Sequence, residues 1–222
     1  MPSAYAGQVK EYGRRWQRPW LGLLVVLASI WAMHLLRRVQ TDKGQFVCQA
    51  VPGSRYRAAV EVDGLYWSAD LEAGLACALK HDRRVLVAFH GMLDTNAKYN
   101  EREVFPERAV KAGLSRYVLV KLYIDYVPAE YYQRQPTEQS RREDGLANME
   151  FEKQYFNTSQ EPLYVVLQPT GHASFGLVGT YEGGLITDSG KFVSFLHNPR
   201  PTPREAFFSS IINKLRQTAG IP

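Results

Sequence analysis

After residue 54, hydrophobic and polar residues alternate in some short stretches, and in other stretches the hydrophobic residues recur at helical spacing. Arg55–Val62 alternates apolar and polar side chains, which predicts a half-buried strand. A helix is predicted over 69–81, where Leu and Ala recur every three or four residues behind a capping position at Ser68. Two nearly all-apolar runs, Val85–Phe89 and Tyr117–Ile124, are typical of strands that are buried on both faces of a sheet.

The later elements continue this alternation. We predict helices at 96–104, 106–113, 150–155 and 204–217, strands at 163–167 and 175–178, and a further element at 191–196. A Pro-Thr-Gly turn at 169–171 joins the last two strands, which predicts an antiparallel hairpin. Strands that alternate with helices predict a three-layer α/β domain with parallel strands over 55–217, followed by a tail at 218–222.

The least polar stretch, Trp20–Leu36, contains one ionisable side chain, His34, and is apolar on every face. At about 1.5 Å per residue it spans about 25 Å, close to the hydrocarbon thickness of about 30 Å. It predicts a transmembrane helix behind a basic N-terminal segment at 1–19. The residues suited to the membrane interface are Arg14, Arg15, Trp16, Arg18, Trp20, Arg37 and Arg38.

Two alternatives to this anchor stay open. A cleaved signal peptide usually has a shorter apolar run and a small-residue cleavage site, which is missing before Arg37. A buried core helix is the second alternative. The Arg residues at both ends and the apolar character of every face weaken it, since a globular surface helix would carry one polar stripe. The basic residues before the segment outnumber those after it by one, so the positive-inside rule places the N-terminus in the cytoplasm and the following domain outside it.

Two polar stretches interrupt the pattern. Residues 37–54 have no helical period and indicate a linker that lifts the domain off the bilayer. Residues 126–148 are rich in Gln, Arg and Glu and are long for a connection within a compact domain, which indicates an insertion. Its candidate partner-binding residues, of types enriched at interfaces, are Tyr126, Tyr131, Tyr132, Arg134, Arg141 and Arg142. No periodic apolar face would bury them in the domain, and a solvated loop is the alternative.

Composition and motifs narrow the functional classes. With 45% hydrophobic residues the chain builds a packed core, and its net charge of +5 suits an anionic membrane surface as well as a nucleic acid. The aromatic residues lack interleaved Lys and Arg stripes, so we expect no nucleic-acid partner. The common phosphate, dinucleotide and hydrolase motifs are absent from the sequence, so we expect no cofactor and no small-molecule substrate. His90 and Asp94 lack a third ligand at recognisable spacing, so no metal is expected.

The two cysteines, Cys48 and Cys77, do not form a CxxC pair. Cys77 stands between two alanines of the predicted helix at 69–81, which is typical of an inert core thiol. Cys48 lies in the predicted linker. A structural disulfide between them in an oxidising compartment is an alternative that the sequence leaves open.

A βαβ unit followed by an α-linked β-hairpin and a terminal helix resembles the thioredoxin fold. The closer resemblance, over about residues 60–215, is to the periplasmic C-terminal domain of the disulfide-interchange reductase DsbD and its relatives. The matching phrases are Trp67 with the helix at 69–81, Val85–Phe89, His90-Gly91, Glu103-Val104-Phe105, Leu122–Asp125, Glu161–Leu167 and the turn at Gly171. The resemblance implies a thioredoxin-like α/β/α domain in the periplasm. Together with the apolar segment at 20–36, it predicts a single-pass protein of a bacterial inner membrane.

The chain departs from this family at the redox loop. The resemblance places Asp94 and Ala97 where the two cysteines of the CxxC stand, and thiol–disulfide exchange requires a thiolate and a second, resolving sulfur. The simplest interpretation of Asp94 is an N-cap of the following helix. Pro162 matches the family's cis-proline, an isomer that an X-Pro bond permits within about 1 kcal/mol. We expect a structural role for it, with partner binding at the open backbone edge as the alternative.

We therefore expect a redox-inactive protein that works by contact. The predicted role is an accessory or scaffolding subunit of a larger membrane complex, such as an electron-transfer assembly. The predicted partners are the lipid bilayer and other subunits of that complex. The alternatives are a thiol–disulfide oxidoreductase that uses Cys48 or Cys77 and a small-ligand or metal-delivery module.

Overall fold

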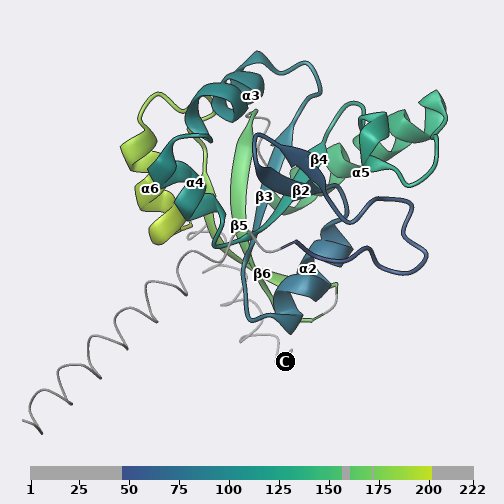
Figure 1. Ribbon diagram of the computed structural model, residues 1–222, viewed down its shortest axis with the longest axis horizontal. Coiled ribbons are helices and arrows are strands. Elements are labelled where there is room, and N and C mark those ends of the chain that lie inside the picture. The colour runs from purple at the N-terminus through teal and green to yellow at the C-terminus, as the bar shows by residue number, and fades with distance from the viewer. Residues whose placement is uncertain (1–46, 157–160, 172, 202–222) are drawn as a thin grey trace, which may run out of the picture. The chain divides into compact units, whose positions relative to one another are not determined.

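The computed structural model describes residues 47–156, 161–171 and 173–201. These residues form a six-stranded sheet with helices on both faces, as Figure 1 shows. The strands are β1 (Val60–Val62), β2 (Leu65–Ser68), β3 (Val85–His90), β4 (Val118–Tyr123), β5 (Leu163–Pro169) and β6 (Phe175–Tyr181). The helices are α2 (Leu71–Lys80), α3 (Thr95–Tyr99), the π-helix η1 (Asn100–Val104), α4 (Arg108–Leu114), the 3-10 helix η2 (Ala129–Tyr131), α5 (Glu138–Phe156) and α6 (Ser189–His197).

The sheet is mixed, with the strand order β1-β2-β4-β3-β5-β6. Strand β4 pairs in parallel with β2 and with β3, whereas the β1–β2, β3–β5 and β5–β6 pairs are antiparallel. The predicted parallel strands are therefore the central ones, and the predicted hairpin is β5–β6. Both follow from the apolar runs and from the Pro-Thr-Gly turn between the hairpin strands.

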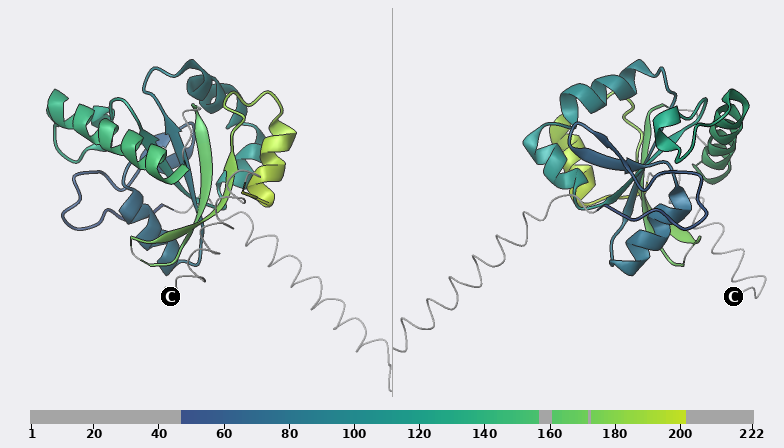
Figure 2. Two further views of the ribbon diagram at one scale, coloured as in Figure 1. Left: turned by 180° about the vertical axis from the view of Figure 1, so that it is seen from behind. Right: turned by 45° about the vertical axis from the view of Figure 1, so that its right-hand side comes forward.

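Helices lie on both faces of the sheet (Figure 2). Between the sheet and the helices of each face lies a separate apolar core. Along β3, Leu86 and Ala88 pack in a cluster with α4 and α6, whereas Val87 and Phe89 pack in a second cluster with α2. Side chains of a strand point alternately to the two faces, so a strand with apolar residues throughout supplies both cores. The predicted three-layer α/β/α arrangement is confirmed for the described residues.

The beginning of the domain differs from the prediction. Only residues 60–62 of the strand expected over 55–62 form β1. Asp63 and Gly64, with φ angles of 51° and 71°, then turn the chain into β2. This Asp-Gly hairpin was not predicted, although the dipeptide favours such turns. Ser68 therefore ends a strand, and Asp70 caps α2 by accepting a hydrogen bond from Ala73 N at 2.9 Å.

The insertion at 126–148 has structure of its own. It contains η2 and most of α5, which also includes the short helix predicted at 150–155. The expectation that Tyr131 and Tyr132 are free for a partner is wrong, because these residues are only 2% and 4% exposed. Both pack in the core cluster of the α4 and α6 face.

Over residues 138–148, helix α5 is held mainly by polar contacts with the end of β4 and the chain that follows it, whereas Met149, Phe151 and Phe156 pack against the core cluster of the α2 face. Asn148 Nδ2 donates to Tyr123 O at 2.9 Å, and Arg141 Nε donates to Val127 O at 2.7 Å. Gly145 allows close approach, since a Cβ there would lie 2.5 Å from the carbonyl oxygen of Asp125. These contacts leave no amphipathic signature, which explains why hydrophobic periodicity did not predict the helix.

The described part of the predicted linker, residues 47–54, is fastened to the domain. Cys48 is bonded to Cys77 of α2, and Ser54 Oγ donates to the Asp70 carboxylate. The predicted transmembrane helix at 20–36, its interface residues, and the helix at 204–217 lie outside the described residues. Of the helices between residues 47 and 201 that the structure describes, none is long and apolar enough to cross a membrane.

Candidate functional site

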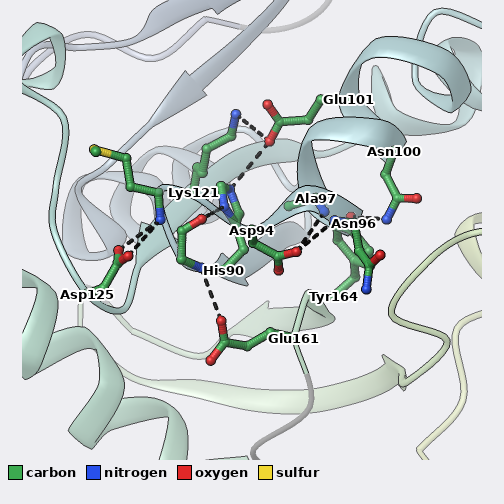
Figure 3. A network of polar contacts seen from close by, with 12 residues as sticks. His90, Asp94, Asn96, Ala97, Asn100, Glu101, Lys121, Asp125, Glu161 and Tyr164 are labelled. Atoms are coloured by element: carbon green, nitrogen blue, oxygen red, sulfur yellow. Dashed lines mark hydrogen bonds and ion pairs between the residues drawn. The ribbon is translucent and has the colours of Figure 1, made fainter.

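The loop Gly91–Asp94 joins β3 to α3 at the carboxyl end of β3, and we call it the β3–α3 loop. Two other segments reach the same edge of the sheet because His90 pairs with Tyr123 at the end of β4 and Phe89 pairs with Leu163 at the start of β5. Asp125 therefore follows close beside the loop, and so does the Glu161–Pro162 peptide bond (Figure 3). This bond is cis, which confirms the isomer expected for Pro162.

Three carboxylates hold the backbone of this loop and of the first turn of α3. Glu161 Oε2 accepts a hydrogen bond from Gly91 N at 3.2 Å, and Asp125 Oδ1 accepts one from Met92 N at 2.8 Å. Asp94 Oδ1 accepts from Asn96 N at 2.8 Å and from Ala97 N at 3.2 Å. The amide groups that surround the start of α3 are thus occupied by the chain's own carboxylates.

The positions of the expected CxxC offer no sulfur. Asp94 is the N-cap of α3, as predicted, and its carboxylate is used on the first turn. Ala97 is 1% exposed, so its methyl group is part of the interior. Next to them Leu93 is 70% exposed and leaves an apolar side chain at the loop surface.

The carboxylates of Asp94, Asp125 and Glu161 form an acidic corner, and burial and mutual repulsion there shift pKa values upwards. Burial, and then the charges of Asp94 and Asp125, raise the pKa of Glu161, while its hydrogen bond from Gly91 N opposes the shift. Burial and the nearby Glu161 raise the pKa of Glu152 on α5 to about 7. The negative charge of the corner therefore depends on pH near neutrality.

A buried ionic cluster lies beneath the loop (Figure 3). Lys121 Nζ of β4 lies 2.8 Å from Glu101 Oε1 of η1, and His90 Nε2 lies 3.4 Å from the same oxygen. Burial lowers the pKa of Lys121, and Glu101 opposes this shift. Burial, followed by the charge of Lys121, also lowers the pKa of His90, which favours the neutral imidazole. One carboxylate thus balances one ammonium group in the interior.

The neighbouring residue Asn100 ties the π-helix to two other segments. Its side-chain amide donates to Tyr164 Oη and to Gly184 O, both at 2.9 Å, and its Oδ1 accepts from Ile186 N at 2.9 Å. All of these groups are buried, so the amide meets its hydrogen-bonding needs without water. Together with the Lys121–Glu101 pair, Asn100 fixes the helical segment that follows the β3–α3 loop.

The cysteines lie away from this loop. They form a disulfide with a Cα–Cα distance of 5.9 Å, which the sequence had left open. Cys77 belongs to the last turns of α2, which precede the beginning of β3, whereas the loop follows the end of that strand. Figure 1 shows α2 and α3 at opposite ends of the domain.

The candidate partner-binding residues of the insertion separate into three groups. Tyr131 and Tyr132 are buried, and Tyr132 Oη donates to Asp144 Oδ2 at 2.8 Å. Arg134 and Arg142 are exposed. The half-buried pair Tyr126 and Arg141 stack on each other, with the guanidinium carbon 3.9 Å from the ring centre.

Sequence reasoning missed the residues that organise the loop from below and from the side. Lys121 had one signal, a charged residue in an otherwise apolar strand, because Lys is almost never buried without a partner. Nothing local identified Glu101 as that partner. Asp125 and Glu161 stood in the matching phrases of the family resemblance without an assigned role. Among the described residues, no group of three or more His, Cys, Asp or Glu is placed to hold a metal ion.

The strand order, the pairing directions and the cis-proline before β5 agree with the thioredoxin-like fold expected from the sequence. Comparison with protein-family models gives no match, and neither does comparison with curated proteins. Among solved structures, the chain is similar to the solution structure of a thioredoxin from Thermus thermophilus. Their sequences are 20% identical, the match covers 59% of this chain and 83% of that chain, and the TM-score is 0.43.

Proposed function

We propose that this chain is a membrane-anchored, redox-inactive thioredoxin-like protein that serves as an accessory or scaffolding subunit of a larger membrane complex, such as an electron-transfer assembly. The occupation of the β3–α3 loop carries the proposal. Where a reactive thiolate would use the amide groups at the start of α3, Asp94 uses them itself. The resemblance to the C-terminal domain of DsbD supports a descent from a redox domain whose loop is now held by carboxylates.

The surface of the same loop favours binding over catalysis. Leu93 is largely exposed, and the carboxylates of Asp125 and Glu161 flank the loop. An apolar side chain in polar surroundings is the usual arrangement of a protein contact. The exposed Arg134 and Arg142 of the insertion add a second region for a partner.

The disulfide supports the proposed location. Disulfides persist in oxidising compartments and are rare in the cytosol. With the apolar segment at 20–36 as an anchor and the charge bias before it, the Cys48–Cys77 bond favours a domain on the periplasmic side. Reporter fusions at the C-terminus test this orientation: activity of a periplasmic reporter is expected, and activity of a cytoplasmic reporter alone would contradict it.

The thiol–disulfide oxidoreductase remains as the second candidate because the chain does contain one disulfide. The two candidates are separated by purifying the native protein in mild detergent and assaying it. The accessory role predicts stable co-purification of other membrane subunits and no catalysis of insulin reduction. The oxidoreductase role predicts catalysis that disappears in the C48S/C77S variant.

A further inference from the structure

The disulfide fastens a segment with few other attachments. We call residues 47–53, which precede Ser54, the strap. Cys48 is the one buried residue of the strap. Within the described structure, the strap takes part in one hydrogen bond, in which Ser54 N donates to Val51 O at 3.0 Å. This bond joins near neighbours in the chain and does not hold the strap to the domain.

From Ser54 onwards the chain is held independently of the disulfide. Gln133 Nε2 donates to Ser54 O at 3.0 Å, and Arg57 N donates to Tyr131 O at 2.7 Å. Tyr56 Oη donates to Asp144 Oδ2 at 2.8 Å. The strap is therefore held on α2 by the Cys48–Cys77 bond and by the packing of Cys48 in the core cluster of that face.

The disulfide is open to a reagent from one side. A cavity of about 550 Å³ adjoins it, lined in part by Val47, Ala76, Lys80 and His81. Cys77 is half-buried and Cys48 is buried, and both line this cavity, so we expect a reagent to reach Cys77 first. Lys80 stands in the last turn of α2, and a cation nearby stabilises a thiolate.

We propose that Cys48–Cys77 is a thiol-exchange site, a substrate for an external dithiol, and that its reduction releases the strap. A thiolate of the dithiol attacks Cys77 Sγ, the bond to Cys48 Sγ breaks, and Cys48 leaves as a thiolate that takes up a proton. The second thiol of the dithiol then displaces Cys77. The dithiol becomes a disulfide, and the chain gains two electrons and two protons.

Release lengthens the connection to the preceding chain. The seven residues of the strap extend to at most about 25 Å. Reduction therefore adds this length of free chain before Ser54. This inference concerns the chain as a substrate, so it stands apart from the proposed accessory role.

The test uses the full chain in mild detergent, with dithiothreitol as the dithiol. A maleimide-polyethylene glycol counts the free thiols, unambiguously because the chain has two cysteines. Without denaturant, both thiols are expected to become labelled after reduction. Elastase cleavage after Ala50 is expected to become about tenfold faster, since proteases act on released segments. The C48S/C77S variant is expected to be cleaved at the fast rate with or without dithiothreitol.

Three results would overturn the proposal. One is labelling that requires denaturant. Another is strap cleavage at equal rates in the oxidised and reduced chain. The third is cleavage that spreads after reduction into β3 and β4, because the disulfide would then hold the whole domain together.

Discussion

Lys121 Nζ lies 2.8 Å from Glu101 Oε1, although the Lys121 side chain is only 1% exposed and stands in an apolar strand. His90 shares the same carboxylate oxygen. With the imidazole neutral, the interior holds one positive and one negative charge. This pair links η1 to the sheet directly beneath the β3–α3 loop, so we expect it to determine how firmly the loop is held.

Glu101→Gln leaves the Lys121 ammonium buried without a counter-charge. Removing one partner of a buried ion pair costs about 3–5 kcal/mol, and we expect a loss of this size in urea denaturation. Glu103→Gln, at an exposed neighbouring position, serves as the control and should change stability by less than about 0.5 kcal/mol. Small and equal effects of the two substitutions would show that Lys121 needs no counter-charge.

Glu152 predicts a pH dependence. Its pKa is raised from 4.5 to about 7 in the folded protein, so the folded state holds a proton that the unfolded chain loses between these values. The contribution to stability is therefore present at low pH and is lost as the pH rises through this window. Glu152→Gln, which stays neutral, should raise Tm by several degrees at pH 8 and leave it within about 1 °C at pH 4.5.

The exposed Glu150 supplies the matched control for this experiment. Glu150→Gln should leave Tm nearly unchanged at both pH values. An equal gain for Glu152→Gln at pH 4.5 and pH 8 would show that the substitution acts through packing, and the titration of this carboxyl would then play no part.

The C48S/C77S variant should be less stable than the oxidised chain. The disulfide closes a loop with a sequence separation of 29 residues, for which the chain-entropy relation gives about 3.5 kcal/mol. Denaturation curves with and without dithiothreitol measure it: reduction should remove most of the difference between wild type and variant.

Co-purification with membrane partners should persist in the C48S/C77S variant. Loss of co-purification from a folded variant would contradict a contact role that is independent of the thiols.

We expect the insertion to contribute to partner binding through its exposed arginines. Arg134→Ala with Arg142→Ala should leave Tm within about 1 °C, because both side chains are on the surface, while weakening retention in the membrane assembly. Arg102→Ala with Arg108→Ala removes the same charge from exposed sites elsewhere. Retention that falls equally in both double variants would show a dependence on net charge alone.

The sequence predicted the central strands and the cis-proline for clear physical reasons. Strands such as β3 supply both cores and therefore appear as unbroken apolar runs. Pro162 was identified by its match to the cis-proline of the family that the sequence resembles, and an X-Pro bond permits the cis form at small cost. The N-cap role of Asp94 followed from its residue type before a helix.

Other features depend on contacts between distant segments, which no local pattern records. Over residues 138–148, helix α5 docks through Asn148 and Arg141 onto main-chain carbonyls, so this part of the helix has no apolar stripe. The buried Tyr132 donates a hydrogen bond from its hydroxyl group to Asp144, which belongs to helix α5. The Lys121–Glu101 pair joins η1, which precedes α4 in the sequence, to β4, which follows α4, and only the fold brings them together.

Insulin reduction by the full-length wild-type chain in the presence of dithiothreitol tests the central claim most directly. Because Asp94 and Ala97 occupy the start of α3 and offer no sulfur, the account predicts a rate equal to the uncatalysed background. The C48S/C77S variant should give the same rate. A wild-type rate clearly above background that disappears in C48S/C77S would contradict the account and identify the chain as a thiol oxidoreductase.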